Sequence, residues 1–284
     1  MNSNKIAFFS IDVEDWYHLE YFTNADKNLN PSITLDGLNN YIELLEKYDI
    51  KSTLFLVGTE AEKIKLSIDK LLSRGHEFGY HSKNHKLVSK ISDELFIEEL
   101  DYAFNFYAKY NITEIGYRAP CFSLGKSKLE ILKNHKSFIY DSSFINQPQH
   151  PLYSPLDLSG FKKTNDGIYT KNGFYEFEVS TEKFLGINIP ISGGGYIRLL
   201  PWFIYKFLLK RYLNNHNTYS FYIHPFETSS IKLAPPQGTS ILTRIRFNYN
   251  RRKVLTRMEK VIKILKKADF KFMTYKDYLN EDIN

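Results

Sequence analysis

The sequence predicts an α/β fold in which helices surround a mostly parallel sheet. Strand-like apolar segments alternate with helix-like segments through the first 140 residues, which is typical of strand–helix–strand units. Polar residues suited to chemistry follow several of these strands, and active residues of parallel sheets gather at such strand ends. The length of 284 residues is ample for one domain with a substantial core.

The elements of the first half follow from local patterns. Gly75 is placed to close a helix, and Ser92 is placed to cap the next one. Apolar residues at helical spacing predict helices at 34–48, 59–74, 93–109 and 127–134. Short apolar runs predict strands at 5–13, 52–57, 76–80, 114–118 and 137–140.

The second half begins with a change of character. Residues 146–195 have few helix formers and strand-like pieces at 168–170 and 174–179, so an irregular β-rich insertion is expected. Its prolines include Pro148, Pro151, Pro155 and Pro190. A helix at 201–213, a strand at 218–224, a basic helix at about 250–267 and a final strand at 270–274 are predicted to follow.

Composition limits the class of protein. Hydrophobic residues at 43% and charged residues at 25% are ordinary for a folded soluble chain. Aromatic residues at 16% suit either an aromatic core or a groove that stacks on sugar rings. The net charge of +6 permits an anionic partner without requiring one, and nucleic acid is not expected because no binding motif is present.

The single cysteine, Cys121, excludes an intrachain disulfide and a cysteine-based zinc cage. The N-terminal residues lack the pattern of a secretory signal, and no long uncharged apolar run is present. A cytoplasmic protein is therefore expected.

Carboxylates are concentrated at the end of the first predicted strand. Asp12, Glu14 and Asp15 fall within four residues, and such a cluster requires shifted pKa values or a bound cation. His81 and His85 follow the third strand at a spacing that would let them share one face of a helical turn and converge on a metal. This mixed set of nitrogen and oxygen ligands suits zinc or a similar divalent ion.

Five sequence blocks follow one another along the chain: SIDVED from Ser10, HSKNH from His81, YRAP from Tyr117, YDSS from Tyr140 and FYIHP from Phe221. Arg118 and Asp141, within these blocks, also fall at predicted strand ends. The order of the blocks resembles that of the polysaccharide deacetylases of the NodB-homology type, carbohydrate esterase family 4. Segments 193–201 and 224–227 resemble the branch associated with exopolysaccharide loci, and the resemblance spans about residues 5–275.

The resemblance implies a distorted, seven-stranded (β/α) barrel that forms one catalytic domain over residues 1–284, with the β-rich insertion. It also implies a divalent metal held by an acid and two histidines, zinc being the first choice and cobalt, nickel or manganese the alternatives. The implied reaction is the hydrolysis of an N-acetyl group from an amino sugar.

The resemblance assigns roles to individual residues. Asp12 would be the general base, Arg118 would hold it in place, and His224 would be the general acid. His81 and His85 would bind the metal. These roles fit amide hydrolysis, which needs an activated water, a polarised carbonyl and a proton for the leaving amine. A backbone N–H of Cys121 or Phe122 would help to hold the oxyanion.

Two assignments stay open. The family motif has two adjacent acids, whereas Val13 separates Asp12 from Glu14 here. Strand alternation favours Glu14 as the carboxylate ligand, and a kink at the strand end would instead deliver Asp15. Asp141 is a candidate for substrate binding or for pairing with His224, although the tryptophan usual near this block is missing.

The expected function is metal-dependent N-deacetylation of an amino sugar in surface or extracellular polysaccharide biosynthesis. The N-acetylated substrate would be a polymer, a lipid-linked sugar or a nucleotide sugar. The alternatives are another amide hydrolysis of the deformylase or imidase type and a catalytically inactive glycan-binding module.

A peripheral contact with the inner face of the membrane is also considered. Segment 201–211 is apolar with basic residues at one end, and the basic helix at about 250–267 would reinforce binding to anionic lipid. The competing interpretation of segment 201–211 is a core helix.

Overall fold

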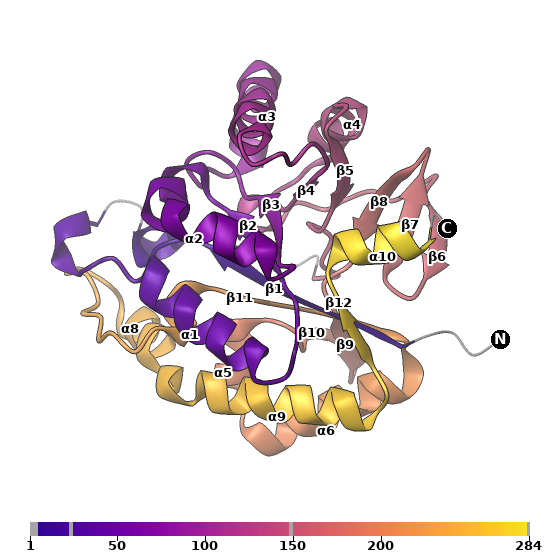
Figure 1. Cartoon of the computed structure of the whole chain (residues 1–284). Helices are drawn as coiled ribbons and strands as arrows, with labels where there is room; N and C mark the ends of the chain where they lie inside the picture. Colours follow the sequence, from indigo (N-terminus) through magenta and orange to yellow (C-terminus); the bar gives the residue numbers. More distant parts are fainter. Residues whose placement is uncertain (1–4, 23–24, 148–149, 283–284) are drawn as a thin grey trace.

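A ten-stranded sheet forms the centre of the protein in the computed structural model, which describes residues 5–22, 25–147 and 150–282 (Figure 1). Its path runs β11-β1-β2-β3-β4-β5-β8-β7-β6, and β12 also pairs with β1. From β11 to β8, all neighbouring strands are parallel. The strands of the sheet are β1 (Ile6–Val13), β2 (Thr53–Leu56), β3 (Glu77–Tyr80), β4 (Ile115–Tyr117), β5 (Phe138–Asp141), β6 (Lys162–Asn165), β7 (Ile168–Lys171), β8 (Phe174–Phe177), β11 (Thr218–Ile223) and β12 (Lys271–Met273).

The two ends of this parallel path meet beyond β8. The backbone N–H of Ser180 donates to the carbonyl of Ser220 in β11 at 3.3 Å, and the Ser220 N–H donates to the Ser180 hydroxyl at 2.9 Å. Seven parallel strands therefore form a distorted barrel that is closed by few hydrogen bonds. The predicted barrel fold is confirmed.

Helices cover the outside of the sheet (Figure 1). Residues of β1 are buried along its whole length, as expected for a parallel strand that is covered on both faces. Ser92 caps α3 as predicted, and Gly75 adopts a φ of +82° directly after α2. The α-helices are α1 (Thr34–Glu46), α2 (Ala61–Ser73), α3 (Asp93–Ala108), α4 (Lys126–Asn134), α5 (Gly194–Leu199), α6 (Trp202–Asn215), α7 (Pro225–Thr228), α8 (Ile241–Asn248), α9 (Val254–Lys267) and α10 (Tyr275–Asp282).

Part of the predicted β-rich insertion contributes a strand to the wall of the barrel. Its strand β8 pairs in parallel with β5, while β7 and β6 continue the sheet in antiparallel fashion. A separate hairpin consists of β9 (Thr181–Phe184) and β10 (Ile187–Pro190). Strand β8 of the predicted β-rich insertion thus belongs to the barrel wall, and Pro148 lies outside the described residues.

Four helices, α5, α7, α8 and α10, were not expected from the sequence. The prediction that a strand at 270–274 ends the fold is wrong, because α10 follows β12 and its first residue, Tyr275, packs between Phe8 and Phe177. Helix α8 buries only Phe247 and contributes little to the core. The basic helix at about 250–267 is confirmed as a short 3-10 turn, Arg251–Lys253, followed by α9.

The interior of the barrel has an apolar end and a polar end. Aromatic side chains of Phe8, Phe55, Tyr140, Phe177 and Tyr275 fill the end beside α10. The other end carries the buried polar residues that follow β1, β3, β4 and β11. Within the described ranges, no helix combines the length and the apolar character needed to cross a membrane.

Candidate active site

Asp12 and Arg118 form a buried ion pair at the polar end of the barrel. Arg118 follows β4, is fully buried, and donates from Nη1 to Asp12 Oδ1 at 2.8 Å. Its other donors reach Ser10 Oγ at 2.8 Å, the Ser142 carbonyl at 3.0 Å and hydroxyl at 2.9 Å, and the Tyr275 hydroxyl at 3.2 Å. The guanidinium is thus fixed on several sides, and it fixes the orientation of the Asp12 carboxylate.

Glu14, His81 and His85 converge beside this pair. Their potential ligand atoms lie within 4.8 Å of one another, and all three side chains are buried. His85 Nε2 approaches Glu14 Oε2 to 2.5 Å, yet this oxygen has no hydrogen-bond partner among the described residues. The two atoms are therefore close without being aligned as donor and acceptor.

His81 is held in the tautomer that leaves Nε2 free. Its Nδ1–H donates to the carbonyl of Arg118 at 2.7 Å, so the Nε2 lone pair faces the site, 4.0 Å from Asp12 Oδ2. Burial lowers the pKa of His81 to about 4 despite the nearby Asp12. A neutral imidazole with a free lone pair is the form that binds a metal.

The residues of this cluster fit a divalent metal such as zinc. A buried carboxylate oxygen without a hydrogen bond and two imidazoles supply the nitrogen and oxygen donors that such ions prefer. Burial acts to raise the pKa of Glu14, but His85, His224 and His81 outweigh it and hold this pKa below its usual range. Glu14 is therefore ionised, as a ligand must be.

The two histidines converge through a loop rather than a helix. Ser82 and His85 have φ values of +64° and +56°, and the Ser82 hydroxyl accepts from the His85 N–H at 2.9 Å. The expectation of a helical turn at 81–85 is wrong. Hydrogen bonds from another segment hold this loop, because the N–H groups of Gly58 and Thr59 donate to the carbonyls of Ser82 and Lys83.

Asp15 lies apart from the metal-binding cluster. Its Oδ1 accepts from the N–H groups of Trp16 at 2.8 Å and Ile33 at 3.2 Å, and its Oδ2 accepts from Ser32 Oγ at 2.5 Å and Lys63 Nζ at 2.9 Å. It caps the 3-10 turn Trp16–His18. Of the two carboxylates left open by the sequence, the structure brings Glu14 to the histidines and gives Asp15 a structural environment.

His224 lies across from the ion pair, directly after β11. Its Nε2 is 3.9 Å from Asp12 Oδ2 and 3.8 Å from Glu14 Oε1. Its Nδ1 donates to Glu227 Oε2 at 3.1 Å, and Arg198 Nε donates to the other oxygen of Glu227 at 2.9 Å. Burial acts to lower the pKa of His224, but the bond to Glu227 and the charges of Glu14, Glu227 and Asp12 raise it to about 9.

Glu227 and Arg198 were missed as site residues, although both lie in segments that the resemblance singled out. Arg198 belongs to the glycine-rich segment before α6. A Cβ atom at Gly194 would overlap the Glu227 carboxylate, so this position requires glycine. The glycine at position 194 is thus explained by close packing against the partner of His224.

Asp141 does not pair with His224, so that expectation is wrong. Its carboxylate accepts from the Ser143 N–H at 2.9 Å and hydroxyl at 2.7 Å and faces Glu176 on the neighbouring strand β8. Burial raises the pKa of both carboxyls. Because Ser143 Oγ also accepts from the Ala119 N–H at 2.8 Å, Asp141 supports the segment that follows Arg118.

Cys121 and Phe122 line the site pocket in strained backbone conformations, with φ values of +50° and +51°. The Phe122 N–H donates to the Ala119 carbonyl at 3.0 Å and is therefore not free for an oxyanion, contrary to one of the two expectations. The Cys121 N–H remains the candidate. Burial raises the pKa of the Cys121 thiol, which disfavours a nucleophilic role.

An aromatic groove leads into the pocket. The pocket, of about 140 Å³, contains the side chains of Asp12, Glu14, His81, His85 and His224. It shares part of its lining with a groove of about 390 Å³. The aromatic residues of this groove include Tyr21, Tyr153, Tyr196, Tyr222 and Phe226.

Two family models together match most of the chain. Residues 33–137 match the model described as polysaccharide deacetylase, and residues 145–280 match a domain of unknown function, DUF3473. Over residues 33–137 the chain therefore matches a polysaccharide deacetylase domain.

Two curated proteins match part of the chain. A peptidoglycan-N-acetylglucosamine deacetylase of Bacillus cereus is 28% identical over 79 residues, which are 28% of this chain and 37% of that protein. An uncharacterized protein of Bacillus subtilis is 36% identical over 67 residues, which are 22% of this chain and 21% of that protein. The matched segments thus cover well under half of either relative.

Solved structures share the fold over nearly the whole chain. A putative polysaccharide deacetylase from Mycobacterium smegmatis is 16% identical with a TM-score of 0.60, and the match covers 99% of this chain and 91% of that one. An allantoinase is 12% identical with a TM-score of 0.63, covering 97% and 89%. A CE4 pseudoenzyme from Bacillus anthracis is 14% identical with a TM-score of 0.53, covering 98% and 66%.

Proposed function

We propose that this protein is a metal-dependent hydrolase that removes the N-acetyl group of an amino sugar during the biosynthesis of a surface or extracellular polysaccharide. One observation carries the proposal. A buried cluster of Glu14, His81 and His85 lies beside the fixed Asp12–Arg118 pair, and a charged His224 lies across from that pair.

Glu14, His81 and His85 would hold the metal, with zinc the first choice and cobalt, nickel or manganese as alternatives. When bound there, the ion would polarise the acetamide carbonyl and acidify a water molecule.

The chain's own residues would move the protons. Asp12 accepts the proton of the attacking water, and Arg118 keeps this carboxylate oriented. His224 donates a proton to the leaving amine nitrogen, with its ring held by Glu227. The N–H of Cys121, a residue of the pocket wall, would donate to the oxyanion.

The groove beside the pocket supports a sugar as the substrate. Its aromatic side chains offer flat apolar faces, while Arg198, Thr243 and Arg246 add polar groups. Polymeric, lipid-linked and nucleotide-linked N-acetylated sugars are the substrates to compare.

Acetate release from a panel of such sugars, after loading with each candidate metal, tests the proposal. We expect release from at least one amino sugar and loss of activity on chelation. Hydrolysis of a formamide or a cyclic imide in place of the acetamide would support another reaction on this scaffold. No hydrolysis with any metal would overturn the proposal.

Variants separate metal binding from proton transfer. We expect His81→Ala and Glu14→Gln to lose the metal, measured by elemental analysis, because each removes a ligand. Asp12→Asn should keep the metal and lose about 10²- to 10⁴-fold in kcat, because it removes the base. Asp15→Asn is the matched control and should keep the metal. Full activity of Asp12→Asn would remove it as the base.

A further inference from the structure

A strongly basic segment lies between His224 and α9. Residues 228–258 contain seven lysines and arginines and no aspartate or glutamate. Positive charge that is concentrated in this way attracts an anionic surface. The seven are Lys232, Arg244, Arg246, Arg251, Arg252, Lys253 and Arg257.

Helix α8, within this segment, turns an apolar face to solvent. Ile241, Leu242 and Ile245 are 76%, 70% and 53% exposed, and Tyr249 follows one turn later at 47%. Their spacing places them on one side of the helix, while Phe247 on the other side packs against Phe22 and Phe226. The helix is thus anchored by one face and exposes another that water solvates poorly.

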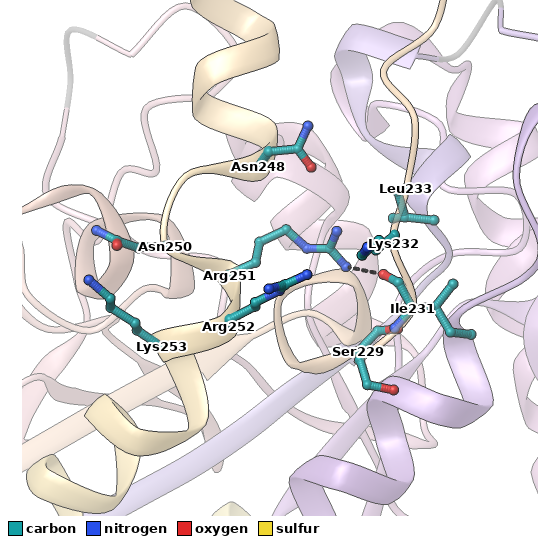
Figure 2. A pocket seen from close by; sticks show the side chains of 10 residues that line it. Ser229, Ile231, Lys232, Leu233, Asn248, Asn250, Arg251, Arg252 and Lys253 are labelled. Carbon is teal, nitrogen blue, oxygen red and sulfur yellow. Dashed lines mark hydrogen bonds between the residues drawn. The ribbon is translucent and has the colours of Figure 1, made fainter.

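A basic pocket of about 460 Å³ adjoins the end of α8 (Figure 2). Arg251 donates from Nε to the Phe226 carbonyl at 2.7 Å and from Nη2 to the Ile231 carbonyl at 3.2 Å. Figure 2 shows Lys232 and Arg252 directed toward the same space from two segments of the chain. Like charges that gather in this way favour an anion between them.

The cations of this pocket lack carboxylate partners. Among the described residues, no ion pair involves Lys232, Arg251, Arg252 or Lys253. Asp36, whose charge acts on Arg251, already accepts from Ser229 and Ser230. The positive charge is therefore available to a ligand.

The same helix borders the substrate groove. Thr243, Arg246 and Phe247 of α8 line the groove that also contains His224. A surface that binds to α8 would consequently lie beside the entrance to the site.

We propose that α8 and the basic pocket dock this protein on an anionic lipid bilayer. Ile241, Leu242 and Ile245 enter the boundary between headgroups and acyl chains, and Lys232, Arg252 and Lys253 contact the lipid phosphates. This docking is independent of the proposed function, but it would present the groove to a sugar that is held at the membrane.

The docking surface on α8 differs from segment 201–211, for which a membrane contact was considered from the sequence. Helix α6 also exposes Phe203 and Phe207, but Phe207 packs on Phe184 of the β9–β10 hairpin, and Arg211 is paired with Glu182. Helix α8, in contrast, has an uncovered apolar face next to the unpaired cations of the basic pocket.

Vesicle sedimentation of the full chain tests the docking. We expect binding to vesicles of mixed phosphatidylcholine and phosphatidylglycerol and much weaker binding to phosphatidylcholine alone. Raising the NaCl concentration from about 0.1 M to about 1 M should release most of the protein, because the Debye length falls from about 10 Å to about 3 Å.

Matched variants locate the surface. Ile241→Asp with Leu242→Asp, and separately Arg252→Glu with Lys253→Glu, should each weaken binding about tenfold or more. Leu66→Asp on α2, at a position that is 92% exposed, and Lys70→Glu with Lys162→Glu are the controls and should change binding less than about twofold. Thermal melting verifies that every variant is folded.

Three outcomes would overturn the docking. They are no binding to any vesicle, binding that is indifferent to lipid charge and salt, and loss of binding in Phe203→Asp with Phe207→Asp but not in the α8 variants. None of them depends on deacetylase activity. An α8 variant that loses vesicle binding should still hydrolyse a soluble substrate, which separates this proposal from the proposed function.

Discussion

At the scale of single residues, the protonation of His224 depends on a chain of buried neighbours. Glu227 accepts from its Nδ1, and Arg198 holds Glu227 from the other side. Among the interactions that raise the pKa of His224, the hydrogen bond to Glu227 is the largest. The charge of the proposed general acid is therefore set by a residue three positions along the chain.

We expect Glu227→Gln to lower the pKa of His224, because the raising interaction is weakened while the burial remains. The alkaline limb of the kcat profile should then move to lower pH by about one unit, with about a twofold loss of activity at pH 8 that approaches tenfold near pH 10. Glu182→Gln, which affects another buried acid paired with an arginine, is the control. An unchanged alkaline limb in Glu227→Gln would exclude this role.

The residues proposed to act in catalysis and metal binding could mostly be predicted from the sequence. The residues that hydrogen-bond to them could not. Asp12, His81, His85, Arg118 and His224 were candidates because each stands in a motif at a strand end. Glu227 was not, because its relation to His224 depends on the backbone turn after β11 and on a contact from a distant segment.

At the scale of elements, the C-terminal helix reaches the site through its first residue. The hydroxyl of Tyr275 is 2.6 Å from Ser220 Oγ and accepts from Arg118 Nη2 at 3.2 Å. Arg118 in turn holds Asp12. Helix α10 therefore supports the proposed base from the opposite end of the barrel.

Tyr275→Phe removes this hydroxyl while it keeps the ring in its aromatic surroundings. We expect kcat to fall about five- to tenfold with little change in KM, because the orientation of Arg118 and Asp12 is less fixed. Thermal melting should show that the variant stays folded at the assay temperature, so that the fall in kcat does not come from a loss of stability.

Tyr205→Phe provides the comparison for Tyr275→Phe. Tyr205 is another buried tyrosine, bonded to the Ile191 carbonyl and remote from Arg118. Its variant should lose stability and leave kcat unchanged. An equal kcat in wild type and Tyr275→Phe would show that Tyr275 only packs.

Elements with regular patterns were predictable, and elements fixed by tertiary bonds were not. The strands and helices of the first half agree with expectation because each type of burial has its own sequence pattern. A parallel strand that is buried on both faces is a short continuous apolar run, and a helix that is buried on one face has apolar residues at helical spacing. The 81–85 loop was mistaken for a helical turn because the spacing of two histidines is the same in both. Strand β8 was assigned to an insertion because pairing partners are not visible locally.

At the scale of the whole molecule, a pair of buried acids joins two strands of the barrel wall. Asp141 and Glu176 are fully buried on the neighbouring strands β5 and β8. Burial raises the pKa of both, so the folded protein binds protons that the unfolded chain releases near pH 4. Their contribution to stability is full below that pH and is lost as the pH rises through the raised pKa values.

We expect Glu176→Gln to remove part of this dependence, because the amide keeps the shape of a protonated carboxyl. Relative to this variant, the wild type should lose about 1–3 kcal/mol of unfolding free energy between pH 4 and pH 8. Urea unfolding at both pH values measures the difference. A difference that does not vary with pH would contradict the shared raised pKa values.

The sequence by itself determined the α/β class, the main helices and strands of the first half, and the motifs that carry the proposed chemistry. These are local patterns, set by periodic burial and by the types of residue at strand ends. The tertiary structure decided that Glu14 rather than Asp15 joins the histidines, that Glu227 rather than Asp141 holds His224, and that β8 belongs to the barrel. Each of these features depends on contacts between segments that are far apart in the chain. Such contacts produce no local sequence pattern, so they could not be predicted.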